Sequence, residues 1–303
     1  MSPPYPPDSM RPMNNFKRTS SRYSSRPATR GASPAGTSPS VKKSHRTFLI
    51  IGIVVAIIAI VGIAVAVQGG DGAKHHWDWN NLKTENGRLV YYEDGSPAST
   101  VGIDVSSLQG EIDWNAVAQD NIDFAMLRCG RRGYTEGGIF ADDQFQTNVA
   151  GAKNAGIPIG VYFFSSAVNE QEALEEANYV IDQINGAGVM YPVVYDAEPV
   201  TDPAGRANNL SSEQLTKNAQ VFCKRIEEAG YLPMVYGNQH DLARMDLKHL
   251  GYEVWYAEYT AGHPTGNADF IMWQYTNEAS VDGIEGPVDM NILLENSWVS
   301  PER

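Results

Sequence analysis

From residue 101 onward, short apolar runs alternate with segments of helical periodicity. Turn residues bound the apolar runs, which predict strands at 101–106, 123–129, 157–164, 191–196, 232–236, 254–259 and 270–276. The clearest predicted helices are Asp142–Ala155, Asn169–Ile184 and Ser211–Ala229. Strands that alternate with helices pair in parallel, and roughly seven or eight such units favour a closed barrel over an open sheet. Because the helical pattern fades after residue 246, we expect an irregular TIM-like β/α barrel over 101–303, an α/β fold.

The chain before residue 101 has a different pattern. Residues 1–47 are rich in Ser, Pro, Arg and Lys, which predicts a disordered tail. Residues 48–67 form an uncharged apolar run of the length that spans a bilayer, so we expect a transmembrane helix there. Residues 68–100 are polar and punctuated by Gly and Asn, which indicates an extracellular stalk with room for one small hairpin.

The charges beside the apolar run predict its orientation. Lys42, Lys43 and Arg46 precede it directly, and by the positive-inside rule the amino terminus stays in the cytoplasm. A cleaved signal peptide is the alternative, since Ala64-Val65-Ala66 resembles a cleavage site. The apolar run is longer than a signal core and its basic leader is far too long. We therefore expect a single-pass cell-membrane protein with its barrel outside.

Charge and cysteine content exclude several classes of partner. The net charge is −13 although the tail is basic, so the exported part is strongly acidic. Contacts to phosphates need clustered Lys and Arg, so this charge argues against nucleic acid as a partner. Cys129 and Cys223 fall on a predicted inner strand and a predicted outer helix, so we expect two unpaired, buried thiols. Neither has the His and Cys neighbours of a zinc site, and His75 and His76 fit solvated linker residues. We expect neither a metal nor another cofactor.

The most informative chemistry follows the apolar run that begins at Tyr191. Asp196 and Glu198 are two residues apart, so on a strand their side chains emerge on the same face. Mutual repulsion and partial burial raise the proton affinity of one acid while its neighbour stays ionised, as glycoside cleavage requires. The alternative is a solvated strand end whose acids cap the following turn.

Other candidate residues lie at or near the ends of the remaining predicted strands, where β/α barrels carry their working residues. They are Asp104, Tyr162, Phe164, Tyr236, Trp255, Tyr259, Trp273 and Tyr275. Rings that stack on the apolar faces of sugars, and acids that accept hydrogen bonds from hydroxyls, are what a carbohydrate groove requires.

From about Val101 to its end the chain resembles the glycoside hydrolase family 25 lysozymes, the Chalaropsis-type muramidases. The motifs that carry the resemblance are Gly102-Ile103-Asp104-Val105-Ser106, Asp196-Ala197-Glu198, Trp255-Tyr256-Ala257-Glu258-Tyr259, Trp273-Gln274-Tyr275 and Asp289-Met290-Asn291. The resemblance implies an irregular β/α barrel that hydrolyses the β-1,4 bond between N-acetylmuramic acid and N-acetylglucosamine. Its expected partner is thus the glycan strand of peptidoglycan. The cell membrane is the second expected partner, through the apolar run at residues 48–67.

The resemblance also implies roles for the acids. Glu198 corresponds to the general acid and Asp196 to its ionised partner, which either steadies the N-acetyl group of the substrate or activates a water. Asp104 and Asp289 match the two remaining acids of the family and are expected to orient substrate or tune the pair. One departure is visible: many relatives carry His after the Tyr of the third strand, whereas here Phe163 follows Tyr162. A separate wall-binding repeat is not apparent, and the anchor could hold the enzyme beneath the wall instead.

Two other functions compete. A chitinase-like barrel also uses an Asp-x-Glu strand end, but it usually carries a further Asp two residues earlier, where this chain has Val194. An inactive wall-binding scaffold domain would keep the groove without catalysis, and the presence of all four acids argues against it.

Overall fold

The computed structural model describes residues 75–259 and 262–295. The predicted tail (1–47) and the predicted membrane span (48–67) lie outside these residues. Within the described ranges, no helix combines the length and the apolar character needed to cross a membrane.

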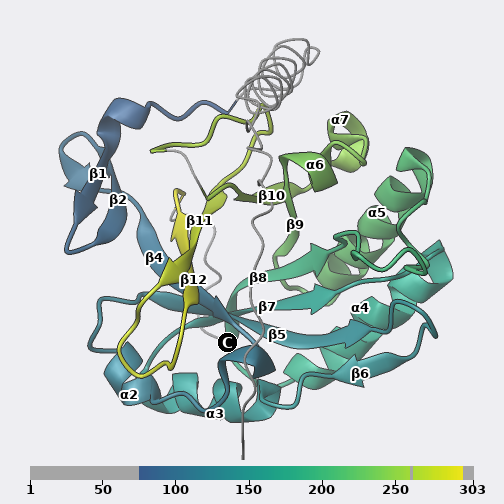
Figure 1. Cartoon of the computed structure of the whole chain (residues 1–303), viewed down its shortest axis with the longest axis horizontal. Helices are drawn as coiled ribbons and strands as arrows, with labels where there is room; N and C mark the ends of the chain where they lie inside the picture. Colours follow the sequence, from purple (N-terminus) through teal and green to yellow (C-terminus); the bar gives the residue numbers. More distant parts are fainter. Residues whose placement is uncertain (1–74, 260–261, 296–303) are drawn as a thin grey trace, which may run out of the picture. The chain divides into compact units, whose positions relative to one another are not determined.

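Eight strands close into a barrel (Figure 1). In chain order they are β4 (Thr100–Val105), β5 (Phe124–Arg132), β7 (Ile159–Phe164), β8 (Val189–Asp196), β9 (Pro233–Asn238), β10 (Glu253–Ala257), β11 (Met272–Ala279) and β12 (Val288–Leu293). Their order around the barrel is β4-β12-β11-β10-β9-β8-β7-β5, and pairing of β4 with β5 closes it. The prediction of a closed β/α barrel is confirmed.

The last strand departs from the predicted pattern. β12 was not predicted as a strand, and it pairs antiparallel with both β11 and β4, whereas the other barrel pairs are parallel. The short connection from β11 to β12 contains no helix, and a connection without a crossover joins antiparallel strands. β6 (Ile139–Ala141) adds an antiparallel edge to β5 outside the closed ring.

The three predicted long helices are present as α3 (Phe145–Ala155), α4 (Glu170–Ile184) and α5 (Ser212–Glu228). Capping residues explain where two of them begin: Asn169 Oδ1 accepts from the Glu172 amide, and Ser211 Oγ accepts from the Gln214 amide. The shorter helices are α2 (Trp114–Val117), α6 (Gln239–Leu242) and α7 (Leu247–Leu250), with a 3-10 turn η2 at Ser107–Gln109. Of the described residues after 246, where the helical pattern fades, the four of α7 are helical, so the fading periodicity indicated the scarcity of helix there but did not predict α7.

Large side chains fill the barrel interior where β4 and β5 begin. The Phe124 ring stacks on Tyr191 with centroids 4.3 Å apart. Gly102 makes room for it, because a Cβ there would lie 2.3 Å from the Phe124 ring. The interior is therefore packed at this end of the barrel.

The segment predicted as a stalk folds onto the barrel instead, from residue 75 onward. The 3-10 turn η1 (Trp79–Asn81) is followed by an antiparallel sheet of β1 (Leu82–Glu85), β2 (Arg88–Glu93) and β3 (Ser96–Pro97). Trp77 is buried, and its Nε1 donates to the Phe270 carbonyl at 2.8 Å. A small sheet is stable only when it packs on something larger, and this packing supplies that support.

Two further expectations about single residues can be compared with the structure. Cys129 in β5 and Cys223 in α5 are free and buried, as predicted. His75 is not a solvated linker residue: its ring packs against Trp79 and Phe270, with centroids 5.0 and 5.4 Å away. The predicted stalk and the predicted solvated His75 were both wrong for the same reason: Trp77 and Trp79 pack the segment against the barrel.

Candidate active site

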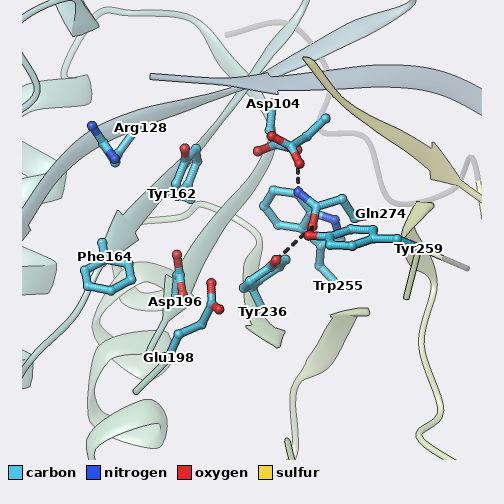
Figure 2. A pocket seen from close by; sticks show the side chains of 11 residues that line it. Asp104, Arg128, Tyr162, Phe164, Asp196, Glu198, Tyr236, Trp255, Tyr259 and Gln274 are labelled. Atoms are coloured by element: carbon cyan, nitrogen blue, oxygen red, sulfur yellow. Dashed lines mark hydrogen bonds between the residues drawn. The ribbon is translucent and has the colours of Figure 1, made fainter. Parts of the chain in front are cut away.

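A cavity of about 270 Å³ opens at the carboxyl ends of the parallel strands (Figure 2). Its lining contains both members of the Asp-x-Glu pair and most of the other predicted residues. The lining residues are Asp104, Arg128, Tyr162, Phe164, Asp196, Glu198, Tyr236, Trp255, Tyr259, Gln274 and Asp289.

Asp196 and Glu198 both reach this cavity (Figure 2). Asp196 is the last residue of β8 and is buried, while Glu198 follows two residues later and is partly buried. Burial, and next the charge of Glu198, raise the pKa of Asp196 well above its ordinary value. Burial, followed by the charges of Asp241 and Asp289, raises the pKa of Glu198 to about 7. Both acids line the same cavity, and the pair holds a proton at higher pH than two solvated acids would.

Asp104 is held by two side-chain amides. Gln274 Nε2 and Asn291 Nδ2 both donate to its Oδ2, at 2.7 and 2.9 Å. Trp255 Nε1 donates to Asn291 Oδ1 at 2.8 Å, and an indole N–H can only donate, so Asn291 must turn its NH₂ group toward Asp104. The orientation of Asn291 therefore follows from its partners.

Gln274 is oriented in the same way by two tyrosines. The hydroxyls of Tyr236 and Tyr259 both donate to Gln274 Oε1, at 2.8 and 2.7 Å (Figure 2). These hydrogen bonds leave the Nε2 group of Gln274 free to donate to Asp104. The two tyrosines line the cavity and also fix one of its acids through Gln274.

Asp289 lies opposite Asp104, because the two residues are Cα partners in the β12–β4 pairing. Burial, and then the charge of Asp289, raise the pKa of Asp104 to about 7. Burial raises the pKa of Asp289 to about 6. The cavity thus contains a second pair of acids, one on each of two neighbouring strands.

Sequence reasoning missed Arg128 and Gln274. Arg128 is the basic member of the cavity lining; its Nε donates to Asp142 Oδ2 at 2.8 Å and its Nη2 to Ser107 Oγ at 3.1 Å. It was detectable as a charged residue near the carboxyl end of an otherwise apolar predicted strand. Gln274 lay within a quoted motif, but its two aromatic neighbours were taken as the site residues in its place.

Those neighbours, Trp273 and Tyr275, do not line the cavity, which corrects their predicted placement. Trp273 is fully buried; its Nε1 donates to the Glu258 carbonyl at 2.9 Å and its ring lies 6.1 Å from that of Trp79. Tyr275 contacts Trp273 with ring centroids 5.7 Å apart. Successive side chains alternate across a strand, so turning Gln274 inward places both rings on the outer face of β11, toward the segment that begins at residue 75.

Trp255 lines the cavity as predicted, but its position limits what it can do. Only 1% of its surface is exposed, and Tyr162 and Tyr236 pack against it at centroid distances of 6.1 and 4.7 Å. It forms the floor of the cavity. Tyr259, which is 40% exposed, is better placed to stack on a sugar.

A second hollow, of about 600 Å³, lies along β9 and β10 and shares part of its lining with the first. The two share Glu198, Tyr236 and Tyr259, and the second also includes Asn238, His240 and Glu258. Glu198 therefore borders both spaces. An acid that protonates a bond between two sugar rings requires such a position.

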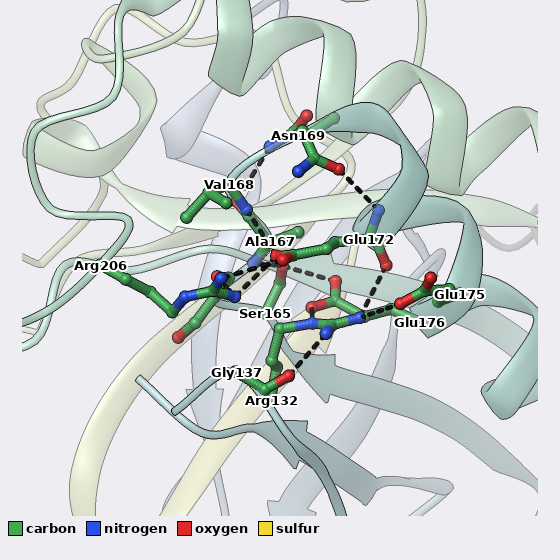
Figure 3. Close-up of polar contacts among 12 residues, drawn as sticks. Arg132, Gly137, Ser165, Ala167, Val168, Asn169, Glu172, Glu175, Glu176 and Arg206 are labelled. Carbon is green, nitrogen blue, oxygen red and sulfur yellow. Dashed lines mark hydrogen bonds and ion pairs between the residues drawn. The ribbon is translucent and has the colours of Figure 1, made fainter. Parts of the chain in front are cut away.

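Polar contacts join the ends of β5, β7 and β8 to α4 (Figure 3). Arg132, at the end of β5, pairs with Glu176 of α4, and Glu176 also accepts a hydrogen bond from Ser165 after β7. Arg206, in the loop after β8, donates to both carboxylate oxygens of Glu172, at 2.6 and 2.9 Å. The loops after β5, β7 and β8 are thus all joined to α4.

The fold and this site define a glycoside hydrolase. The chain belongs to glycosyl hydrolases family 25, whose sequence profile matches residues 103–284.

In the described part of the chain, no cluster of three or more His, Cys, Asp and Glu side chains is arranged to hold a metal ion.

Named relatives are similar to this chain over roughly two thirds of its length. The chain is 28% identical over 201 residues to an autolytic lysozyme of Clostridium acetobutylicum, covering 65% of this chain and 57% of that protein. It is 29% identical over 218 residues to lysozyme M1 of Streptomyces globisporus, covering 64% and 69%. The matched region thus spans little more than half of the first relative.

Solved structures agree with the fold. The modular autolysin LytC of Streptococcus pneumoniae, in complex with a synthetic peptidoglycan ligand, matches with a TM-score of 0.58 and 25% identity over 70% of this chain and 52% of that one. The spore cortex lytic enzyme SleM of Clostridium perfringens matches with a TM-score of 0.59 and 25% identity, covering 69% and 72%.

Proposed function

We propose that this protein is an N-acetylmuramidase, which hydrolyses the β-1,4 bond between N-acetylmuramic acid and N-acetylglucosamine in peptidoglycan. The observation that carries the proposal is the Asp196–Glu198 pair at the carboxyl end of β8, facing a cavity lined by acids and aromatic rings. Membership of glycosyl hydrolases family 25 supports it, as do the relatives described as lysozymes. The similarity to LytC, whose structure contains a peptidoglycan ligand, supports the choice of substrate.

In this proposal Glu198 is the general acid. Its pKa of about 7 keeps much of it protonated near neutral pH, so it can donate to the leaving oxygen. The two spaces that Glu198 borders would receive the sugars on either side of the scissile bond.

Asp196 is the ionised partner in this proposal, although its burial opposes ionisation. Its Oδ1 is buried and accepts no hydrogen bond from a described residue. A substrate N–H that donates to this oxygen would favour the anion, and the 2-acetamido group of the sugar carries such an N–H. This argument favours a role in steadying the N-acetyl group over the activation of a water.

The remaining lining residues would bind the substrate. Asp104 and Asp289 would accept and donate hydrogen bonds, and Tyr162, Tyr236 and Tyr259 would contact sugar rings and hydroxyls. Trp255 would support these residues from below.

We also propose that residues 48–67 anchor the enzyme in the cell membrane, with the amino terminus cytoplasmic and the barrel extracellular. The uncharged apolar run and the basic residues before it support this topology. Protease added to intact cells should remove the barrel and leave a fragment that contains residues 1–47. Protection of the barrel until the cells are lysed would contradict the topology.

Digestion of purified peptidoglycan by the full-length chain tests the activity. Fragments with a new reducing-end muramic acid would support the proposal, and reducing-end glucosamine would indicate another glycosidase. Cleavage of chitin in preference to peptidoglycan would favour the chitinase-like alternative. Binding to peptidoglycan without release of fragments would indicate the inactive scaffold.

A further inference from the structure

Asp104 and Asp289 are an unusual pair, because two acids directly opposite each other on neighbouring strands repel. Asp104 is 7% exposed and Asp289 is partly buried, so water screens this repulsion weakly. If one of the two carboxyls keeps a proton, the repulsion is replaced by a state with a single negative charge.

The surrounding hydrogen bonds decide where a proton on Asp104 can lie. Its Oδ2 accepts from two amide groups, Gln274 Nε2 and Asn291 Nδ2, which the Tyr236, Tyr259 and Trp255 donors hold in this orientation. A hydroxyl on Oδ2 would point at one of these donors. A proton on Asp104 is therefore confined to Oδ1.

Other charged groups near the pair also favour retention of a proton. The titratable and charged side chains that line the cavity with it are Asp196 and Glu198 from the end of β8, Tyr162 from β7, Tyr236 from β9, Tyr259 after β10 and Arg128 from β5. Arg128 is the cation in this set, and its charge is already paired with Asp142 at 2.8 Å. The field at the pair is thus mainly negative, which disfavours a second negative charge there.

We propose that Asp104 and Asp289 hold one proton between them and together bind one free hydroxyl of the substrate. The protonated carboxyl donates to the hydroxyl oxygen, and that hydroxyl donates to the ionised carboxyl. A sugar hydroxyl can do both at once, whereas an ether or ester oxygen can only accept. The pair would therefore select for an unmodified hydroxyl on the glycan. The nature of the ligand rests on the proposed function, but the shared proton does not.

The shared proton can be tested without turnover. We would follow the ¹³C carboxyl signals of labelled aspartate against pH in the full-length chain, in the wild type and in Asp289→Asn. The pair should titrate in two steps, one of them well above the ordinary aspartate value of about 3.9, and Asp289→Asn should lower the Asp104 midpoint by about one pH unit or more. Asp143→Asn, which removes an exposed acid outside the cavity lining, is the control and should leave that midpoint unchanged.

Kinetics test the binding of the hydroxyl. Asn supplies a fixed donor in place of the protonated acid, so Asp104→Asn and Asp289→Asn should each keep kcat/KM within roughly tenfold of the wild type, and Leu at either position should lose roughly 100-fold. In the Asn variants the pair has no shared proton to lose as the pH rises, so any part of the fall in kcat/KM that is not due to Glu198 should disappear.

Two results would overturn the proposal. Titration of both wild-type carboxyls together near the ordinary aspartate value would exclude a shared proton. A 100-fold loss in both Asn variants at every pH would show that two negative charges are required. If the titration succeeds and peptidoglycan is not cleaved by the wild type, the proposed function fails while the shared proton stands.

Discussion

The Arg132 guanidinium and the Glu176 carboxylate form an ion pair of 2.7 Å in which both side chains are buried. Arg132 ends β5 and Glu176 belongs to α4, so the pair joins a barrel strand to the helix outside it. Glu176 also accepts from Ser165 at 2.6 Å, at the start of the loop after β7. The pair thus links the end of β5, α4 and the residue that follows β7.

Replacement of Arg132 by Met should destabilise the fold by about 3–5 kcal/mol, because it leaves Glu176 buried without a cation. Urea denaturation near neutral pH would measure the loss. Arg131→Met is the matched control, since Arg131 is exposed and its side chain packs over Phe140. Equal losses of stability in the two variants would show that the buried ion pair stabilises the fold no more than the exposed Arg131 does.

Glu198→Gln should abolish hydrolysis of peptidoglycan, with a loss of about 10²–10⁴-fold or more in kcat, because Gln cannot donate a proton to the leaving oxygen. The melting temperature should stay the same or rise, since a partly buried acid is removed from beside Asp196. Glu111→Gln, at an exposed acid outside the catalytic cavity, should retain activity. A Glu198→Gln enzyme that digests walls at the parent rate would show that the acid is misassigned.

The activity of the wild-type enzyme should fall as pH rises through about 7, because Glu198 loses the proton that it must donate. The pH profile of kcat/KM for a soluble glycan fragment measures this limb. A profile that stays flat to pH 9 would be inconsistent with Glu198 as the acid.

Asp104→Asn should stabilise the protein at pH 7.5 and have little effect at pH 4. The folded-state pKa of Asp104, about 7, lies above that of the unfolded chain, so the folded state binds its proton more tightly. As the pH rises from the unfolded-state pKa of Asp104 to its folded-state pKa, each pH unit lowers the free energy of unfolding by up to about 1.4 kcal/mol. Asn does not ionise, so the variant avoids this loss. Chemical denaturation at the two pH values measures it, and a stabilisation that is larger at pH 4 would refute the sign.

Gly102→Ala should cost about 1–3 kcal/mol, because the added methyl would overlap the Phe124 ring in a packed interior. Thermal and urea unfolding measure the loss. Gly262→Ala is the control, since a Cβ there would meet no atom within 4 Å. Equal stability of the two variants would mean that the Phe124–Tyr191 stack can shift to make room.

Much of the barrel could be predicted because its signals are local. Strand and helix boundaries followed from apolar periodicity and from caps such as Ser211. The fading of the helical pattern after residue 246 agrees with the described residues there, in which the four-residue α7 is the one helix, whereas β12 was missed as a strand although Asp289 had been singled out. The stalk was predicted from polar composition. Composition did not reveal that the buried Trp77 donates a hydrogen bond to the backbone carbonyl of Phe270 in the barrel.

The sequence by itself indicated that Asp196 and Glu198 reach the same site, because residues two apart in an extended segment point to the same side whatever the rest of the fold is. β8 ends at Asp196, so the loop that follows the strand brings Glu198 to the cavity. Only the tertiary structure decided that Asp104 faces Asp289, since that contact depends on antiparallel pairing between strands far apart in the chain. It also decided that Gln274 points inward and Trp273 outward. The inner face of a strand is chosen by how the whole sheet closes and by what packs outside it, and a short motif contains neither.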